Sequence, residues 1–187
     1  MSFPVSVPAN SSRFFSSLEE AKSQPRALVR LSSFVGPGNE GYLFNREFDA
    51  TKIRYDSSYC TDNQFHEEIS WINIKNFLKQ LKDDFPHFQV IDIGCGQGEI
   101  VSKCQEVGIN SIGFDPTLRR PSPNLVKQYY TAEALRAHEV YDSTARHIFV
   151  MRCVLPHIAN PLEFINDLFN EFPDCIVYFE FKILATL

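Results

Sequence analysis

The spacing of apolar residues becomes regular from Phe65 onward. Apolar side chains then recur at steps of three and four, which places them on one face of a helix that Pro86 would end. That face consists of Phe65, Ile69, Ile72, Ile74, Phe77, Leu78 and Leu81. We therefore predict a helix that leads into a folded domain.

After this helix, short apolar runs alternate with helical segments. Strands are predicted at Gln89–Ile93, Ser111–Asp115, Val126–Tyr130, His147–Met151 and Cys175–Phe181. A helix is predicted over Gly98–Val107 with Val107 facing inward, and another is predicted to begin at Asn160. Nearly continuous apolar strands that alternate with helices are typical of a parallel sheet covered on both faces. The predicted fold class is therefore doubly wound α/β.

The first 61 residues differ from the rest of the chain in amino-acid composition. They are rich in Ser, Pro and Phe, with a turn cluster from Gly36 to Gly41. A short helix is predicted near SSLEEA, where Ser17 and Glu20 have capping-box spacing. We predict an irregular arm over residues 1–61 and one domain over residues 62–187.

Composition narrows the choice of partners and compartment. The chain has 187 residues, 44% of them hydrophobic, and a formal net charge of −5. The chain has no long run of consecutive lysines or arginines, so we do not expect it to bind nucleic acid through electrostatic attraction. The first residues do not show the positively charged segment and apolar run of a signal peptide, and no later stretch of about 18 apolar residues predicts a membrane span. The five cysteines form no CxxC pair, so we expect reduced thiols and no metal site in a cytoplasmic protein.

The stretch VIDIGCGQGE carries the candidate chemistry. Gly94, Gly96 and Gly98 follow the first strand directly, where a tight bend would let backbone N–H groups approach an anionic ligand. A dinucleotide fingerprint would need a third glycine at the position of Glu99, so a pyrophosphate ligand is disfavoured. A ligand with one carboxylate and one ammonium group fits better, with Asp92 as acceptor for the ammonium.

A second carboxylate, Asp115 in GFDPT, ends the second strand. A carboxylate at this position can accept hydrogen bonds from both hydroxyl groups of a ribose. The alternative is that Asp92 and Asp115 only cap helices and turns, as isolated aspartates usually do. Their positions at adjacent strand ends, on either side of the glycine turn, favour ligand binding.

These motifs together resemble the class I S-adenosylmethionine-dependent methyltransferases. FDATKIRYDSSYCTDNQF, RCVLPHIANPLEFI and IVYFEF further resemble a subgroup akin to sugar C-methyltransferases, and the resemblance covers about Phe48 to Phe181. It implies a Rossmann-like methyltransferase fold and S-adenosyl-L-methionine as the cofactor. The expected function is methyl transfer to a small-molecule acceptor, with a sugar or a sugar-like metabolite as the candidate class.

The resemblance also assigns cofactor-binding residues. Gly94, Cys95 and Gly96, with Asp92 and Gly98 beside them, would lie along the methionine part, and Asp115 would bind the ribose. The remaining positions are Pro116 and Thr117 beside the adenine, Gln128 as acceptor for its amino group, and Tyr55 and Tyr59 folding over the cofactor. The two tyrosines would equally serve as packing anchors.

His157 is the candidate general base. It stands in LPHI, where the family usually has LEHI, so Pro156 replaces an acidic residue and a purely structural His157 stays open. Arg152 would fix an anionic group of the substrate or form a surface salt bridge. Cys153 is expected to be a packing residue and not a nucleophile.

Domains of this family usually continue after the fifth strand, whereas this sequence ends at FKILATL. We therefore expect a domain without its C-terminal strands, whose apolar fifth-strand edge is covered by a second copy or another partner. This expectation keeps an alternative function open, a non-catalytic cofactor-binding remnant or interaction module. A nucleotide-dependent dehydrogenase is disfavoured by Glu99 and by the glycine spacing.

Overall fold

The structure, a computed structural model, describes residues 5–8, 17–23, 26–35, 41–46, 48–49, 52, 55, 68–85 and 87–180. The chain divides into two compact units, Met1–Tyr55 and Asp56–Leu187. Each unit is described by itself.

The N-terminal unit contains two antiparallel pairs of strands. β1 (Val5–Pro8) pairs with β2 (Arg26–Val29), and β3 (Leu31–Val35) pairs with β4 (Gly41–Asn45). The segment expected to be an irregular arm therefore contains paired strands, and Pro8, Ser32, Ser33 and Gly41 lie within them. The expected helix is present as α1 (Leu18–Lys22), and Ser17 Oγ caps it by accepting from the N–H of Glu20 at 3.1 Å.

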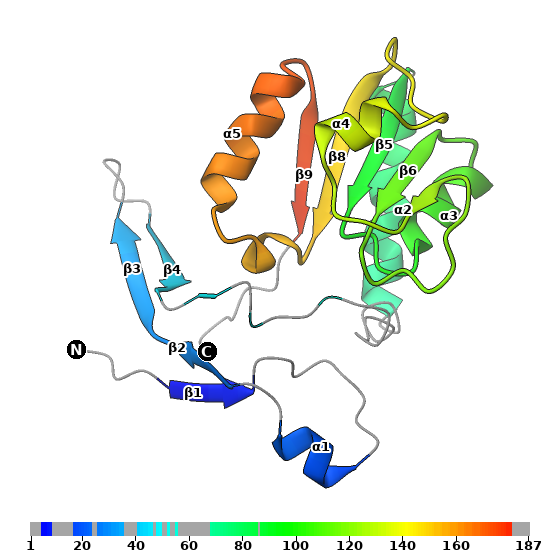
Figure 1. The fold of residues 1–187 in the computed structure, drawn as a ribbon. Helices are drawn as coiled ribbons and strands as arrows, with labels where there is room; N and C mark the ends of the chain where they lie inside the picture. Colours follow the sequence, from blue (N-terminus) through cyan, green and yellow to red (C-terminus); the bar gives the residue numbers. More distant parts are fainter. Residues whose placement is uncertain are drawn as a thin grey trace. The chain divides into compact units, whose positions relative to one another are not determined.

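The larger unit is built on a sheet of five parallel strands (Figure 1). In chain order these are β5 (Phe88–Ile93), β6 (Ser111–Phe114), β7 (Leu125–Val126), β8 (Arg146–Arg152) and β9 (Ile176–Glu180). Their order across the sheet is β7-β6-β5-β8-β9, and every neighbouring pair is parallel. The predicted doubly wound α/β fold is confirmed.

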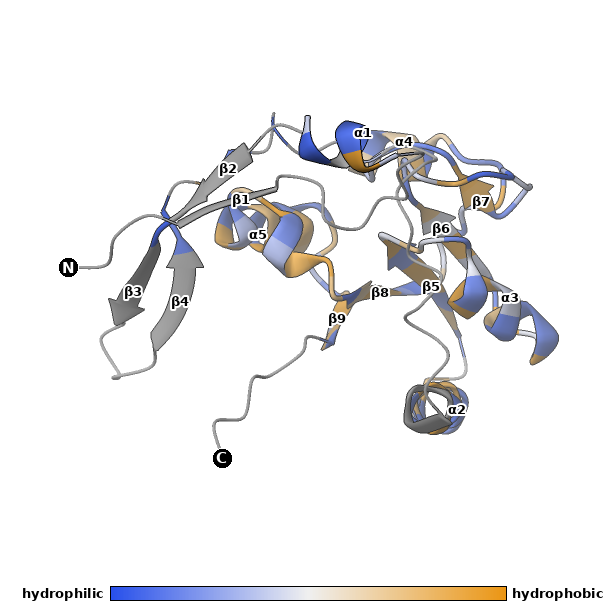
Figure 2. Cartoon of the chain, turned by 90° about the horizontal axis from the view of Figure 1, so that it is seen from below, coloured by the Kyte–Doolittle hydropathy of each residue, from blue (hydrophilic) through white to orange (hydrophobic). Residues whose placement is uncertain are grey.

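Helices cover both faces of this sheet, as Figure 2 shows. They are α2 (Glu68–Asp84), α3 (Glu99–Glu106), α4 (Ala132–Arg136) and α5 (Pro161–Glu171), with a 3-10 turn, η3 (Leu155–His157). The third strand ends at Val126, earlier than predicted, and the unpredicted α4 follows. Thr131 Oγ1 accepts from the N–H of Ala134 at 3.0 Å and starts this short helix. Within the described residues, no helix has the length and apolar character needed to cross a membrane.

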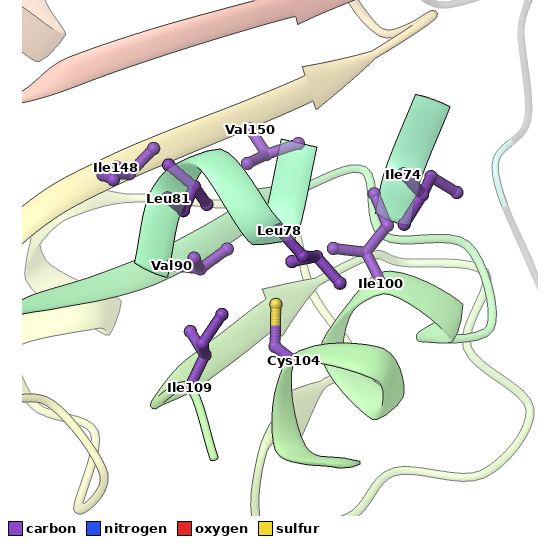
Figure 3. Close-up of a cluster of buried hydrophobic side chains, with 9 residues drawn as sticks. All are labelled: Ile74, Leu78, Leu81, Val90, Ile100, Cys104, Ile109, Ile148 and Val150. Carbon is purple, nitrogen blue, oxygen red and sulfur yellow. The ribbon is translucent and has the colours of Figure 1, made fainter. Parts of the chain in front are cut away.

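The core lies in two layers, one on each face. On one face α2 and α3 pack against β5 and β8 through nine buried residues (Figure 3): Ile74, Leu78, Leu81, Val90, Ile100, Cys104, Ile109, Ile148 and Val150. On the other face, Leu135 of α4 and Leu168 of α5 pack against Ile91, Phe114 and Phe149.

Two residues expected in the core are exposed, Ile72 by 52% and Val107 by 41%. Ile72 precedes Ile74 by two residues, which is roughly 200° around a helix, so the two cannot share the buried face. Val107 is the residue that follows the last turn of α3. The expectation that further strands are missing after the fifth one stays a prediction, since residues 181–187 lie outside the described part.

Candidate functional site

The strand order reverses between β5 and β8, because β6 lies on one side of β5 and β8 on the other. In open α/β sheets, ligands bind beyond the carboxyl ends of the strands at such a point. Two segments begin there: the glycine turn Gly94–Gly98, which follows β5, and Cys153–His157, which follows β8. The fold thus brings the predicted cofactor turn and the predicted base to the same edge of the sheet.

The glycine turn is held mainly by hydrogen bonds within the protein. The N–H groups of Gly94 and Cys95 donate to the carbonyl of Phe114 at 2.8 and 3.2 Å, and that of Gly98 donates to Cys95 at 2.9 Å. The N–H of Gly96 donates to Asp115 Oδ2 at 2.9 Å. The end of β6 and Asp115 thus already accept from three of these N–H groups, and the assignment of the turn to the cofactor stays a prediction.

Close packing explains why glycine is needed at both ends of this turn. Gly94 has a φ of 73°, and a Cβ there would overlap Cγ2 of Val154. Gly98 has a φ of 90°, and its Cβ would lie 2.6 Å from both methyl carbons of Leu125. Side chains therefore approach the turn from both sides, from the segment after β8 and from β7.

Asp115 organises the edge beside this turn. Its carboxylate is 7% exposed and accepts from the N–H of Gly96, and also from the N–H and hydroxyl of Thr117 at 2.7 and 2.6 Å. A carboxylate has about four acceptor positions. Asp115 thus caps the turn, as the structural alternative anticipated, and one acceptor position remains for a ligand.

Asp92 is the least solvated carboxylate of the site. It is 2% exposed, so it is almost entirely removed from water. Burial raises the pKa of Asp92 from 3.8 to about 7; Arg152 opposes this rise, and the negative charges of Asp115 and Glu99 add to it. A buried carboxylate among other acidic groups is suited to receive a cation.

Arg152, at the end of β8, forms a two-pronged ion pair with Glu180 of β9. The Nε and Nη2 atoms of Arg152 donate to the two carboxylate oxygens of Glu180 at 2.6 and 3.0 Å. The two side chains are only 10% and 32% exposed. The predicted salt bridge is present and largely buried. Sequence reasoning missed Glu180, although the two residues end neighbouring strands.

Cys95 points into the protein. It is 5% exposed, and burial raises the pKa of its thiol. A Cβ on Gly113 of β6 would lie 2.8 Å from Cys95 Sγ and 2.9 Å from Val101. Gly113 therefore gives the turn room to lie against β6. Sequence reasoning missed this role because Gly113 stands alone in its strand and belongs to no glycine motif.

The remaining predicted residues are more exposed or lie outside the described part of the larger unit. Pro116 is half-buried, and Gln128 is exposed just after β7. His157 is exposed in η3, and partial desolvation lowers the pKa of its imidazole. Tyr59 lies outside the described residues, and Tyr55, half-buried, belongs to the N-terminal unit.

Comparison with known proteins adds one match. Residues 65–182, which include the whole described sheet, match a family described as a methyltransferase domain. Among curated proteins, no relative of the chain was found.

Proposed function

This chain belongs to the methyltransferase domain family, and from that membership we propose that it transfers a methyl group from S-adenosyl-L-methionine to a small-molecule acceptor. The proposed acceptor class is a sugar or a sugar-like metabolite, which rests on the resemblance of its motifs to sugar C-methyltransferases. The cofactor supplies a methyl group bonded to a positively charged sulfur.

The observation that carries this proposal is the environment of Asp92. Asp92 is 2% exposed, and burial raises the pKa of its carboxyl group to about 7. Asp115 and Glu99 add negative charge nearby, and the charge of Arg152, which is itself paired with Glu180, opposes them. Because a buried carboxylate is unfavourable in its charged form, a further cation would stabilise it, and the ammonium group of the cofactor has the required charge.

The same edge of the sheet suits a dinucleotide poorly. Binding of a pyrophosphate at this turn depends on free N–H groups, whereas those of Gly94, Cys95, Gly96 and Gly98 are already bonded within the protein. Glu99 in the first turn of α3 would also repel a pyrophosphate. Titration of the purified chain with S-adenosylmethionine and, separately, with NAD tests the choice. Binding of NAD alone would contradict the proposal.

In the proposed site, Asp92 accepts a hydrogen bond from the ammonium group, and Asp115 uses its remaining acceptor position for a ribose hydroxyl. His157 accepts a proton from the acceptor substrate. Its lowered pKa suits this role, because an imidazole that is neutral near pH 7 can act as a base.

Asp115→Ala is expected to weaken the binding of S-adenosylmethionine by about 1.5 to 3 kcal/mol, since a hydrogen bond to a charged group is lost. Calorimetric titration measures this change. Asp142→Ala is the matched control, because Asp142 also accepts from the N–H and hydroxyl of a threonine two residues later, Thr144, and has no place in the proposed site. We expect unchanged affinity for Asp142→Ala, and unchanged affinity for Asp115→Ala would refute the assignment.

His157→Ala is expected to lower kcat by about 10²- to 10⁴-fold, the usual contribution of a general base. Cofactor affinity should stay at the wild-type value. In the wild-type chain, the rate should fall as pH drops through the lowered pKa of His157, because the protonated imidazole cannot accept a proton. A methylation assay over a panel of sugars and related small acceptors measures both effects. Binding of the cofactor without methyl transfer to any acceptor would favour the non-catalytic alternative.

A further inference from the structure

Three neighbouring strands place charged residues on one face of the sheet, near its carboxyl edge. In the parallel register, Asp92 of β5 pairs with Val150, and Arg152 of β8 pairs with Glu180 of β9. Because side chains alternate along a strand, Val150 and Arg152 point to the same face. Asp92, Arg152 and Glu180 therefore project from the same face near the carboxyl edge of the sheet. Arg152 lies two residues further along β8 than Val150, the partner of Asp92, so it is the diagonal neighbour of Asp92.

Arg152 lies on β8, between the strands that carry the two carboxylates, and is bound to one of them, Glu180. Its Nε and Nη2 atoms both donate to Glu180, at 2.6 and 3.0 Å, so one complete edge of the guanidinium is committed to β9. Glu180 holds the same end of β8 a second time, because its backbone carbonyl accepts from the N–H of Cys153 at 2.6 Å. Cys153 has a φ of 57°, an uncommon value for a residue other than glycine. The last residue of β9 thus fixes the direction of Arg152.

We propose that Glu180 is a positioning residue of the cofactor site, which holds Arg152 and so keeps the Asp92 carboxylate available for the cationic group of the ligand. This inference rests on the proposed function. Without Glu180, the guanidinium would be able to turn to Asp92, its diagonal neighbour on β5, and would occupy the place of the ammonium group.

Among the described residues, Arg152 is the positively charged group that acts on Asp92. Asp92 is influenced by Asp115 from the end of β6 and by Glu99 from α3, both of which add negative charge. Two thiols, Cys95 in the glycine turn and Cys104 in α3, also interact with it electrostatically. Among these groups, Arg152 is the one whose charge opposes the others. A change in the direction of the Arg152 side chain should therefore change the pKa of Asp92.

The first test uses the ligand-free protein. Glu180→Gln keeps the size of the side chain and removes its charge, so Arg152 should pair with Asp92 and lower the pKa of that carboxyl group by about 1 to 3 units. NMR titration of the Asp92 carboxyl carbon measures this change. Glu171→Gln is the matched control, because it breaks the Arg136–Glu171 ion pair of 2.7 Å, which lies on α4 and α5. We expect Glu171→Gln to leave the pKa of Asp92 unchanged.

The second test measures affinity for S-adenosylmethionine by calorimetry near pH 8. We expect Glu180→Gln to weaken binding about 10-fold or more, as for loss of a charged hydrogen bond. The double variant R152M/E180Q removes the competing guanidinium as well, and its affinity should recover toward that of the wild-type chain. A purely structural role for Glu180 would not allow this recovery.

Two outcomes would overturn the inference alone: a wild-type chain that binds the cofactor while Glu180→Gln leaves the Asp92 pKa unchanged, or a double variant that binds no better than Glu180→Gln. A wild-type chain that binds no S-adenosylmethionine would overturn the proposed function, and this inference with it.

Discussion

Gly94→Ala is expected to lower the free energy of unfolding by about 2 to 5 kcal/mol. About 1 to 2 kcal/mol of this comes from placing a side chain on a left-handed backbone, since Gly94 has a φ of 73°. A further 1 to 3 kcal/mol, roughly, comes from overpacking, because the new methyl group would overlap Val154. Denaturation in urea measures the total.

Gly108→Ala separates these two contributions. Gly108 has nearly the same φ, 72°, but a Cβ there would meet no atom within 4 Å. We therefore expect Gly108→Ala to cost only the backbone contribution of about 1 to 2 kcal/mol. Val154→Ala should restore part of the stability of Gly94→Ala, by making room for the methyl group. Equal losses for the two glycine variants would contradict the close contact between the glycine turn and the segment after β8.

This contact connects stability with function. Val154 immediately precedes η3, the turn that carries His157. A side chain at Gly94 would push this segment away from the end of β5, so Gly94→Ala should also weaken binding of S-adenosylmethionine. Gly108 follows α3, away from the carboxyl ends of the strands, and Gly108→Ala should leave affinity unchanged.

The sequence predicted those parts of the fold whose pattern is local. Strands β5, β6, β8 and β9 are short apolar runs, and their predicted ranges agree with the structure to within about one residue at most ends. The end of the third strand and α4 could not be predicted in this way. β7 has two residues and α4 has five, so neither is long enough to establish a period of its own.

The candidate site was predicted where it depends on sequence neighbours and missed where it depends on strand register. The positions of Asp92 and Asp115 at strand ends follow from the strands themselves. Glu180 lies 28 residues after its partner Arg152, and their contact exists because β8 and β9 are adjacent in the sheet. Gly113 likewise acquires its role from Cys95, which lies on a different segment. Neither contact corresponds to a regular spacing in the sequence, so neither could be predicted from the sequence alone.

Asp92→Asn is expected to stabilise the ligand-free protein at neutral and alkaline pH while weakening cofactor binding. Burial raises the pKa of Asp92 from 3.8 to about 7. Between these values, the folded protein holds a proton that the unfolded chain has released, so stability falls as pH rises through this window and stays lowered above it. Because each pKa unit corresponds to about 1.4 kcal/mol, the wild-type chain loses roughly 4 kcal/mol by pH 8.

Asn has nearly the same shape as Asp and carries no charge, so the variant should escape most of this loss. Relative to the wild-type chain, Asp92→Asn should gain about 3 kcal/mol more stability near pH 8 than near pH 5. Thermal or urea unfolding at the two pH values measures this difference.

Asp142→Asn provides a control of opposite sign. Hydrogen bonds from the hydroxyl and N–H of Thr144 lower the pKa of Asp142, so its charged form stabilises the fold, and that stabilisation is lost as pH falls through the lowered pKa. Asp142→Asn should therefore destabilise the protein at neutral pH, where Asp92→Asn stabilises it. If Asp92→Asn were instead destabilising near pH 8, the carboxylate would already have a favourable partner in the ligand-free protein. Asp92 would then be a structural residue, and the argument that its unmet charge selects a cationic ligand would fail.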